Sequence, residues 1–165
     1  MTARPTAGFL FRHPAHFIAL GFGTGLVPAA PGTIGTLLAV PLYAVLSLWL
    51  PPLSLLGAVA ILFGIGIWAC DRTGRDLGVA DHGSMNWDEA VAFMLVLLLT
   101  PDGRGWQAAA FLAFRFFDIA KPEPIRYFEK TVKGGLGVMF DDIVAAAYTL
   151  LSMAAVAFIL RWLGK

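Results

Sequence analysis

One polar stretch, DHGSMNWDEAV at residues 81–91, places oxygen and nitrogen ligands directly before the apolar run AVAFMLVLLL. Its titratable groups are Asp81, His82, Asp88 and Glu89. Acidic residues in the first turn stabilise a helix through its dipole, and Ser84 is expected to cap this helix. Such a local role explains one acid, but it does not explain the whole group. We therefore interpret this stretch as part of a site for a charged ligand.

A second stretch, FRFFDIAKPEPIRYF at residues 114–128, alternates cations with a carboxylate. Arg115, Asp118 and Lys121 are spaced i, i+3, i+6, which predicts that they line one face of a helix. Pro122 disfavours a helical Lys121, so the helix is expected to end there. Such a row is usually a solvated row of ion pairs. Beside an apolar segment it also provides fixed cations that can bind a phosphate group.

The third stretch, GGLGVMFDDIVAAAY at residues 134–148, carries Asp141 and Asp142 after a glycine-rich segment. We expect these two acids to start the final helix. Successive helix residues point about 100° apart, so the pair is not expected to chelate one ion together. One of them is expected to bind a metal, while the other caps the helix, contacts a cation or touches a second ion. The alternative is that both acids only stabilise the start of the helix.

The glycine-rich stretch GFGTGLVPAAPGTIGT at residues 21–36 precedes the first long apolar run. It lacks the Lys-Ser/Thr pair of a Walker A loop, and no strand precedes its glycines, so neither nucleotide motif fits. Thr33 is expected to cap the helix that follows. The amides at this helix start can also receive a phosphate group.

The ligand types in these stretches favour a hard cation. Carboxylates dominate, whereas the chain has one cysteine, Cys70, and three histidines. Mg²⁺ is the expected ion, and it is bound by a few carboxylates, water and substrate phosphate. Such an ion polarises phosphoryl oxygens and generates a hydroxide nucleophile, although an aspartyl-phosphate route stays open. The candidate metal ligands are Asp81, Asp88, Glu89, Asp118, Asp141 and Asp142.

The elements that position these groups are apolar helices. Of the 165 residues, 58% are hydrophobic and 14% are charged, whereas soluble domains are about half apolar and a quarter charged. We therefore predict an all-α fold, a single-domain, multi-pass membrane helical bundle over residues 1–165. We expect Pro41 to kink the first segment and Pro51-Pro52 to break the chain after it. The apolar segments are residues 33–50, 53–70, 89–100, 106–117 and 143–163.

The two short segments, 89–100 and 106–117, flank the turn at 101–105 and are either two thin spans or a re-entrant pair. If all five segments alternate from a cytoplasmic N-terminus, only Arg104, Arg161 and Lys165 lie outside, which leaves nine of the twelve basic residues inside. Ten of the eleven acidic residues also lie inside. This asymmetry agrees with the positive-inside tendency and predicts a polar site at the cytoplasmic helix ends. The net charge of +1 and the lack of a basic block exclude nucleic acid as an expected partner.

Four blocks of this sequence together resemble the phosphatidylglycerophosphatase A family. They occur in order within residues 20–150: PGT at 31–33, DHGSMNWDE at 81–89, FRFFDIAKPEPI at 114–125 and GGLGVMFDDI at 134–143. The resemblance implies a magnesium-dependent lipid phosphatase of the bacterial inner membrane, which converts phosphatidylglycerophosphate to phosphatidylglycerol and phosphate. Ala92 and Ala146 depart from the family, whose members often have glycine there. The family's polar residues correspond to Thr33, Asp81, His82, Asp88, Glu89, Arg115, Asp118, Lys121, Asp141 and Asp142.

The division of roles among these residues is a hypothesis from their chemistry. Thr33, Arg115 and Lys121 are expected to bind the substrate phosphate. The candidate catalytic residues are Asp81, His82, Asp118 and Asp142. A small transporter is the alternative function, but it calls for ionisable groups within the spans, and residues 33–70 carry no charge. A non-catalytic scaffold would not need acids and glycines on one face. The oligomeric state, the number of metals and the lipid selectivity stay open.

Overall fold

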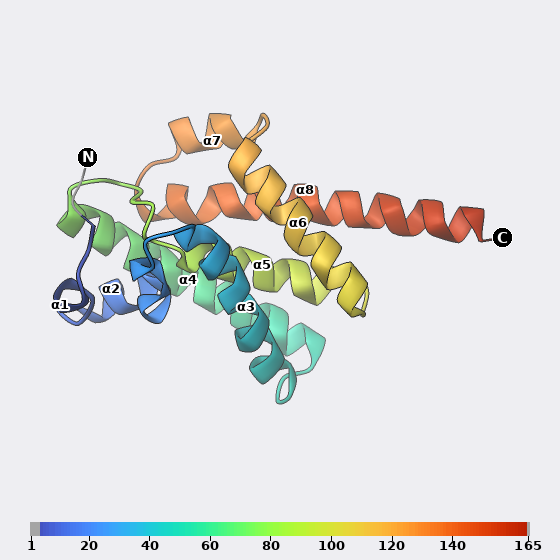
Figure 1. Cartoon of the computed structure of the whole chain (residues 1–165), viewed down its shortest axis with the longest axis horizontal. Helices are drawn as coiled ribbons and strands as arrows, with labels where there is room; N and C mark the ends of the chain where they lie inside the picture. Colours follow the sequence, from blue (N-terminus) through green and yellow to red (C-terminus); the bar gives the residue numbers. More distant parts are fainter. Residues whose placement is uncertain (1–3, 165) are drawn as a thin grey trace.

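The computed structural model describes residues 4–164, without the side chains of residues 129 and 130, and every regular element in that part is a helix (Figure 1). The prediction of an all-α fold is therefore confirmed for these residues. The elements are α1 (Ala7–Leu10), α2 (Pro14–Ala19), the 3₁₀ helix η1 (Gly21–Leu26), α3 (Pro31–Ser47), α4 (Pro52–Leu77), α5 (Trp87–Leu99), α6 (Arg104–Ala120), α7 (Ile125–Thr131) and α8 (Gly134–Leu163).

Two of these helices, α4 and α8, are long and apolar enough to cross a membrane, as judged by length and composition. They have 26 and 30 residues, so at 1.5 Å per residue both exceed the roughly 30 Å thickness of a bilayer's hydrocarbon core. Large apolar side chains also lie exposed at the α3–α4 turn, where Trp49 and Leu53 are each 82% exposed. Exposed apolar surface of this extent indicates association with a membrane.

Helix α4 continues beyond the segment predicted from hydrophobicity, which ended at residue 70. Its last two turns are polar and are held by ion pairs between residues four apart, Asp71 with Arg75 and Arg72 with Asp76. The helix ends at Gly78, which adopts the left-handed conformation that suits glycine at a helix end. The hydrophobic pattern located the apolar part of α4, but it did not predict the polar turns that extend the helix to Leu77.

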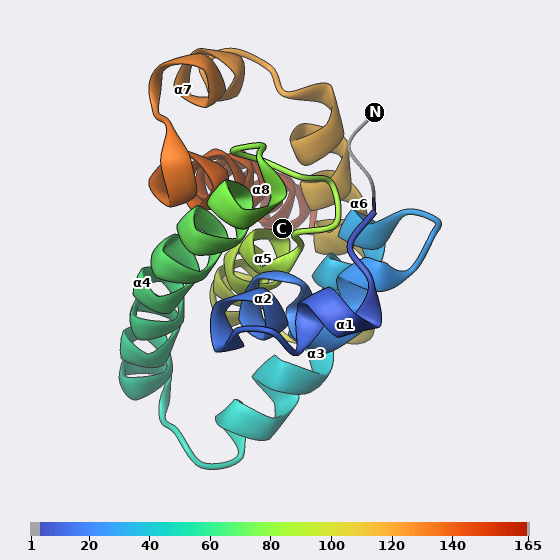
Figure 2. The same ribbon diagram turned by 90° about the vertical axis from the view of Figure 1, so that its left-hand side faces the viewer.

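The short helix α5 lies at the centre of the bundle and packs against α3, α4, α6 and α8 (Figure 2). Its side chains Phe93 and Met94 are buried, together with Phe114 from α6 and Met139 from α8. Gly66 of α4 allows α8 to approach closely, because a Cβ atom there would overlap the Met139 side chain. This packing fixes the start of α5 relative to the helices around it.

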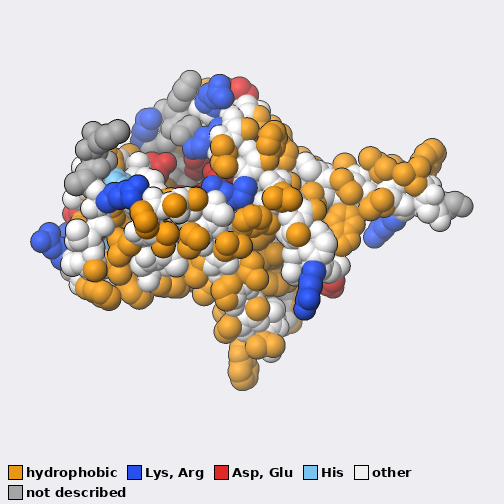
Figure 3. Space-filling model, viewed as in Figure 1, with side chains coloured by type: hydrophobic (Ala, Val, Ile, Leu, Met, Phe, Trp, Pro, Cys, Tyr) orange, Lys and Arg blue, Asp and Glu red, His pale blue; other side chains and the backbone are white. Residues whose placement is uncertain are grey.

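The polar ends of the main helices lie together. In Figure 1, α3, α5 and α8 begin, and α4 and α6 end, in the left half of the molecule. Figure 3 shows Lys and Arg side chains around a recess with acidic side chains in that half, whereas the lower protrusion is almost entirely hydrophobic. The fold thus brings the polar stretches of the sequence to one end of the bundle.

Candidate functional site

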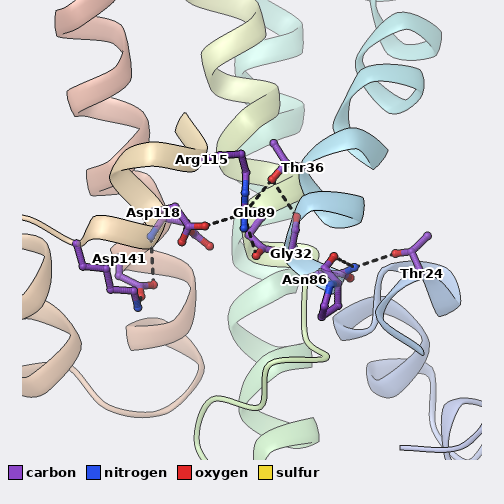
Figure 4. Close-up of polar contacts among 11 residues, drawn as sticks. Thr24, Gly32, Thr36, Asn86, Glu89, Arg115, Asp118 and Asp141 are labelled. Atoms are coloured by element: carbon purple, nitrogen blue, oxygen red, sulfur yellow. Dashed lines mark hydrogen bonds and ion pairs between the residues drawn. The ribbon is translucent and has the colours of Figure 1, made fainter. Parts of the chain in front are cut away.

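Arg115 of α6 is the centre of a polar cluster (Figure 4). Its Nη1 atom lies 2.6 Å from Asp118 Oδ2, 3.3 Å from Glu89 Oε1 and 3.3 Å from Thr36 Oγ1. The side chains of Arg115, Asp118 and Glu89 are 15%, 14% and 12% exposed, so the ion pairs are largely shielded from solvent. One guanidinium therefore joins α3, α5 and α6 at their polar ends.

Lys121 forms a second ion pair at this end, with Nζ 2.8 Å from Asp141 Oδ2 of α8. The helix α6 ends at Ala120, and Lys121 follows it with φ 42°, so the expected termination before Pro122 is confirmed. Arg115 and Asp118 share a helix face as predicted. Lys121 instead stands just beyond the helix, where its left-handed backbone directs the ammonium toward α8.

The prediction that Asp141 and Asp142 start the final helix is wrong. Helix α8 begins at Gly134, so the two acids lie in its third turn, away from the N-terminal dipole. The glycines belong to the helix because α8 starts against α4, where a side chain at position 135 would collide with the Ile67 carbonyl oxygen. A role for these acids as partners of the helix start is therefore excluded.

The start of α3 approaches Glu89 more closely than a side chain would allow. A Cβ atom on Gly32 would overlap Glu89 Oε1, and one on Gly35 would lie 2.7 Å from Glu89 Oε2. Thr33 does not cap this helix, because α3 begins at Pro31 after a left-handed Ala30. Thr33 is instead the third residue of the first turn. The sequence signal for the close approach of α3 to Glu89 is a set of small residues on one face of α3. Gly35 and Thr36 lie one turn after Gly32.

Asn86 connects the start of α5 to η1 and α3 through hydrogen bonds, and it was not identified from the sequence. Its side chain is fully buried, and its Nδ2 donates to Thr24 Oγ1 at 3.0 Å and to the Pro31 carbonyl at 3.1 Å. Asn86 is also the N-cap position of α5, so the expected cap at Ser84 is wrong. Residue type and spacing gave no signal for Asn86, because its partners are brought near only by the fold.

The predicted residues of the 81–89 stretch take different positions. His82 is 7% exposed, and its Nδ1 accepts a hydrogen bond from the Ser84 amide, so a neutral ring carries its proton on Nε2. Asp81 is exposed and lines a cavity of about 140 Å³ together with Lys133 and Asp141. Asp88 is buried at the start of α5. The structure thus brings Asp81 next to Asp141 across 60 residues of chain.

The carboxylates at this end repel one another. Burial, and then the Asp118 carboxylate, raise the pKa of Glu89 to about 8, against the opposing effect of Arg115. Burial, followed by the charges of Glu89 and Asp81, also raises the pKa of Asp88. Asp142 is 4% exposed and lies within electrostatic range of Asp88 and Asp118. All six predicted metal ligands therefore lie in one region, where an additional cation would be favourable.

The donor set suits Mg²⁺ in kind. Asp88 Oδ1 and Glu89 Oε2 are buried without a hydrogen-bond partner, which leaves two carboxylate oxygens for an ion. Among the described residues, no three His, Cys, Asp or Glu side chains stand ready to hold one metal ion. Magnesium does not require such a cage, since it keeps several waters and takes one or two carboxylates plus a substrate phosphate. Cations, carboxylates and free oxygens together can bind a phosphate monoester with a divalent ion.

Comparison with known proteins gives a consistent result. A family model described as phosphatidylglycerophosphatase A matches residues 17–157. The phosphatidylglycerophosphatase A of Haemophilus influenzae is 43% identical over 153 residues, which cover 88% of this chain and 90% of that protein. The protein of the same name from Escherichia coli is 44% identical over 135 residues, 81% of this chain and 77% of that protein.

A third relative carries a different name. The Bacteroides thetaiotaomicron protein provisionally named a phosphatidylinositol-3-phosphatase is 40% identical over 152 residues, 88% of this chain and 92% of that protein. No solved structure matches the chain. The matched residues 17–157 include the four stretches at 21–36, 81–91, 114–128 and 134–148. The chain belongs to the phosphatidylglycerophosphatase A family.

Proposed function

We propose that this protein hydrolyses phosphatidylglycerophosphate to phosphatidylglycerol and inorganic phosphate in phospholipid biosynthesis, with Mg²⁺ as the cofactor. The observation that carries the proposal is the Arg115 cluster, in a chain that belongs to this family. A guanidinium held by two carboxylates and a hydroxyl is fixed in place and keeps donors for phosphate oxygens. Such positioning and electrostatic stabilisation are what phosphoryl transfer requires.

We assign roles to these residues from their chemistry and from the region in which they lie. Arg115 and Lys121 bind the terminal phosphate, with Thr33 and the first amides of α3 beside them. Glu89 and Asp142 would hold the ion, with Asp81, Asp88, Asp118 and Asp141 around them. When bound, Mg²⁺ polarises the phosphoryl oxygens and lowers the pKa of water.

Hydrolysis breaks the bond between phosphorus and the glycerol oxygen, and the water oxygen takes its place. The departing glycerol oxygen requires a proton, and we assign its donation to His82 Nε2, because Nδ1 accepts a hydrogen bond from the Ser84 amide. Asp118 keeps Arg115 oriented through the 2.6 Å ion pair. Attack by Asp118 or Asp142 to form an aspartyl phosphate is the second possible route to the same products.

We further propose that the chain is a multi-pass protein of the bacterial inner membrane, with this site on the cytoplasmic side. The support is the common location of the polar helix ends, together with the excess of basic residues in the loops there. Arg104 and Arg161 mark the opposite ends of α6 and α8. The substrate phosphate then lies at the depth of the lipid headgroups.

Phosphate release from a panel of lipids tests the function. The purified protein in lipid vesicles is expected to release phosphate from phosphatidylglycerophosphate in preference to phosphatidylinositol 3-phosphate, the lipid named for the third relative. Asp118→Asn is expected to reduce release at least 100-fold. Asp102→Asn, at the other end of α6, is the matched control and should retain wild-type activity. If the protein releases phosphate from neither lipid, the proposal is contradicted.

A further inference from the structure

An apolar groove begins close to the Arg115 cluster. It has a volume of about 410 Å³ and lies between α3 and α6, with α5 at its base. Its apolar lining includes Leu37, Val40, Phe93, Leu97, Phe111 and Leu112. Arg104 and Gln107, in the first turn of α6, line its far end.

The groove and the polar cluster are built from the same three helices. Phe93 stands four residues after Glu89 in α5, and Phe111 stands four residues before Arg115 in α6. Residues four apart lie on the same helix face. In α3, Val40 stands four residues after Thr36, which is bonded to Arg115. The groove is therefore continuous with the cluster that we place at the substrate phosphate.

One side of the groove is open. Leu37, Val40 and Leu112 line it and are 47%, 42% and 68% exposed. Along α6, Arg104 and Arg115 are eleven positions apart, which corresponds to about 16 Å at 1.5 Å per residue. This length is about half of the ~30 Å hydrocarbon core of a bilayer, and thus about the depth of one acyl chain in a single leaflet.

We propose that the groove holds one acyl chain of the lipid whose phosphate binds at Arg115. This inference rests on the proposed function, because it assigns a place to the apolar part of the same substrate. The polar cluster recognises the phosphate, whereas the groove selects a lipid over a water-soluble phosphate monoester. The open side allows the chain to enter laterally from the bilayer.

Filling the groove tests its role in catalysis. Ala108 lines the groove and is exposed, so Ala108→Trp places an indole where the acyl chain lies. Its neighbour Ala109 is also exposed and does not line the groove, so Ala109→Trp is the matched control. We measure kcat/KM for phosphatidylglycerophosphate and for the water-soluble compound that remains when both acyl chains are removed. The ratio of the two is expected to fall about tenfold in Ala108→Trp and to stay at the wild-type value in Ala109→Trp.

A binding measurement separates the groove from the reaction. Phosphatidylglycerol with a photoreactive group on one acyl chain is incorporated into vesicles with the protein, and the crosslinked residues are identified by mass spectrometry. Adducts are expected to concentrate on Leu37, Val40 and Leu112, and to decrease severalfold in Ala108→Trp but not in Ala109→Trp. Adducts spread equally over other exposed apolar residues, such as Phe158 of α8, would overturn the proposal.

The kinetic and crosslinking measurements together distinguish the lipid groove from the proposed phosphatase function. A wild-type protein that concentrates adducts in the groove but releases no phosphate would contradict the proposed function and support the lipid groove. A wild-type protein that releases phosphate, with an unchanged kcat/KM ratio in Ala108→Trp, would overturn the groove and leave the function in place.

Discussion

The side chains of Lys121 and Asp141 meet across 20 residues of sequence, with Nζ 2.8 Å from Oδ2. Lys121 has a positive φ of 42°, which is uncommon for residues other than glycine. Pro122 excludes a further helical residue, and the left-handed turn directs the lysine toward α8. Unusual backbone conformations of this kind gather at functional sites, where the surrounding structure maintains them.

The charge of Lys121 is expected to matter more than its backbone conformation. Asparagine tolerates the left-handed region, so Lys121→Asn removes the cation while preserving the turn. Loss of a charge-assisted contact to phosphate is expected to reduce kcat/KM about 10- to 100-fold, and loss of the ion pair with the largely buried Asp141 is expected to lower the melting temperature. Phosphate release and thermal unfolding in detergent measure the two quantities. Wild-type activity in Lys121→Asn would exclude a role for this cation.

The glycines at the start of α3 are expected to be intolerant of a side chain. Gly32→Ala and Gly35→Ala each place a methyl group against Glu89, and overpacking of this kind costs about 1–3 kcal/mol of unfolding free energy. Gly57→Ala in α4 is the control, since nothing lies within 4 Å of an added Cβ there. This control should be neutral or stabilised by up to ~1 kcal/mol. Equal unfolding temperatures for all three variants would contradict the close approach of α3 to Glu89.

Asn86 is expected to hold the start of α3 in place. Asn86→Ala removes both hydrogen bonds from its amide, which should cost about 1–3 kcal/mol of stability. Thr24→Val removes one of these bonds and also the bond that Thr24 Oγ1 donates to the Gly21 carbonyl at 2.8 Å. In a double-mutant cycle, the two changes are expected to be non-additive, because they share one hydrogen bond. Strict additivity of the two changes in unfolding free energy would show that the hydrogen bond between Asn86 and Thr24 does not contribute to stability.

Arg115 is expected to be irreplaceable by lysine. Its Nη1 contacts three side chains from three helices, and a single ammonium lacks the planar fork that keeps further donors for a ligand. Arg115→Lys should therefore lose at least tenfold in kcat/KM while keeping the charge. The matched control is Arg161→Lys near the end of α8, which should behave as wild type. Equal activity of the two variants would argue against Arg115 as the phosphate ligand.

Much of the fold could be predicted from the sequence. The uncharged runs at 33–50 and 53–70 located α3 and the apolar part of α4, because long apolar segments have few alternatives to a helix. The pattern did not reveal α1, α2, η1 or α7, which have between four and seven residues. Helices of this length form through packing on their neighbours rather than through their own periodicity.

The residue types of the site were predicted, but the contacts between their side chains were not. Carboxylates and cations were identified by type, and Arg115 and Asp118 by their spacing. The partners of Arg115 on α3 and α5 could not be predicted, since Thr36 and Glu89 are separated by 53 residues and meet only after packing. The start of α8 was misplaced because glycines suggest a loop, whereas here they allow α8 to contact α4.

The most direct test of the central claim is the magnesium dependence of phosphate release in wild type, Glu89→Gln, Asp142→Asn and the control Asp102→Asn. Chelation of divalent ions is expected to stop release by wild type, and added Mg²⁺ to restore it. Glu89→Gln and Asp142→Asn, from α5 and α8, should each require at least about tenfold more Mg²⁺ for half-maximal rate, because each loses an ionic oxygen ligand. Asp102→Asn should match wild type. Release that persists after chelation, or an identical Mg²⁺ requirement in all four proteins, would contradict a shared cation site.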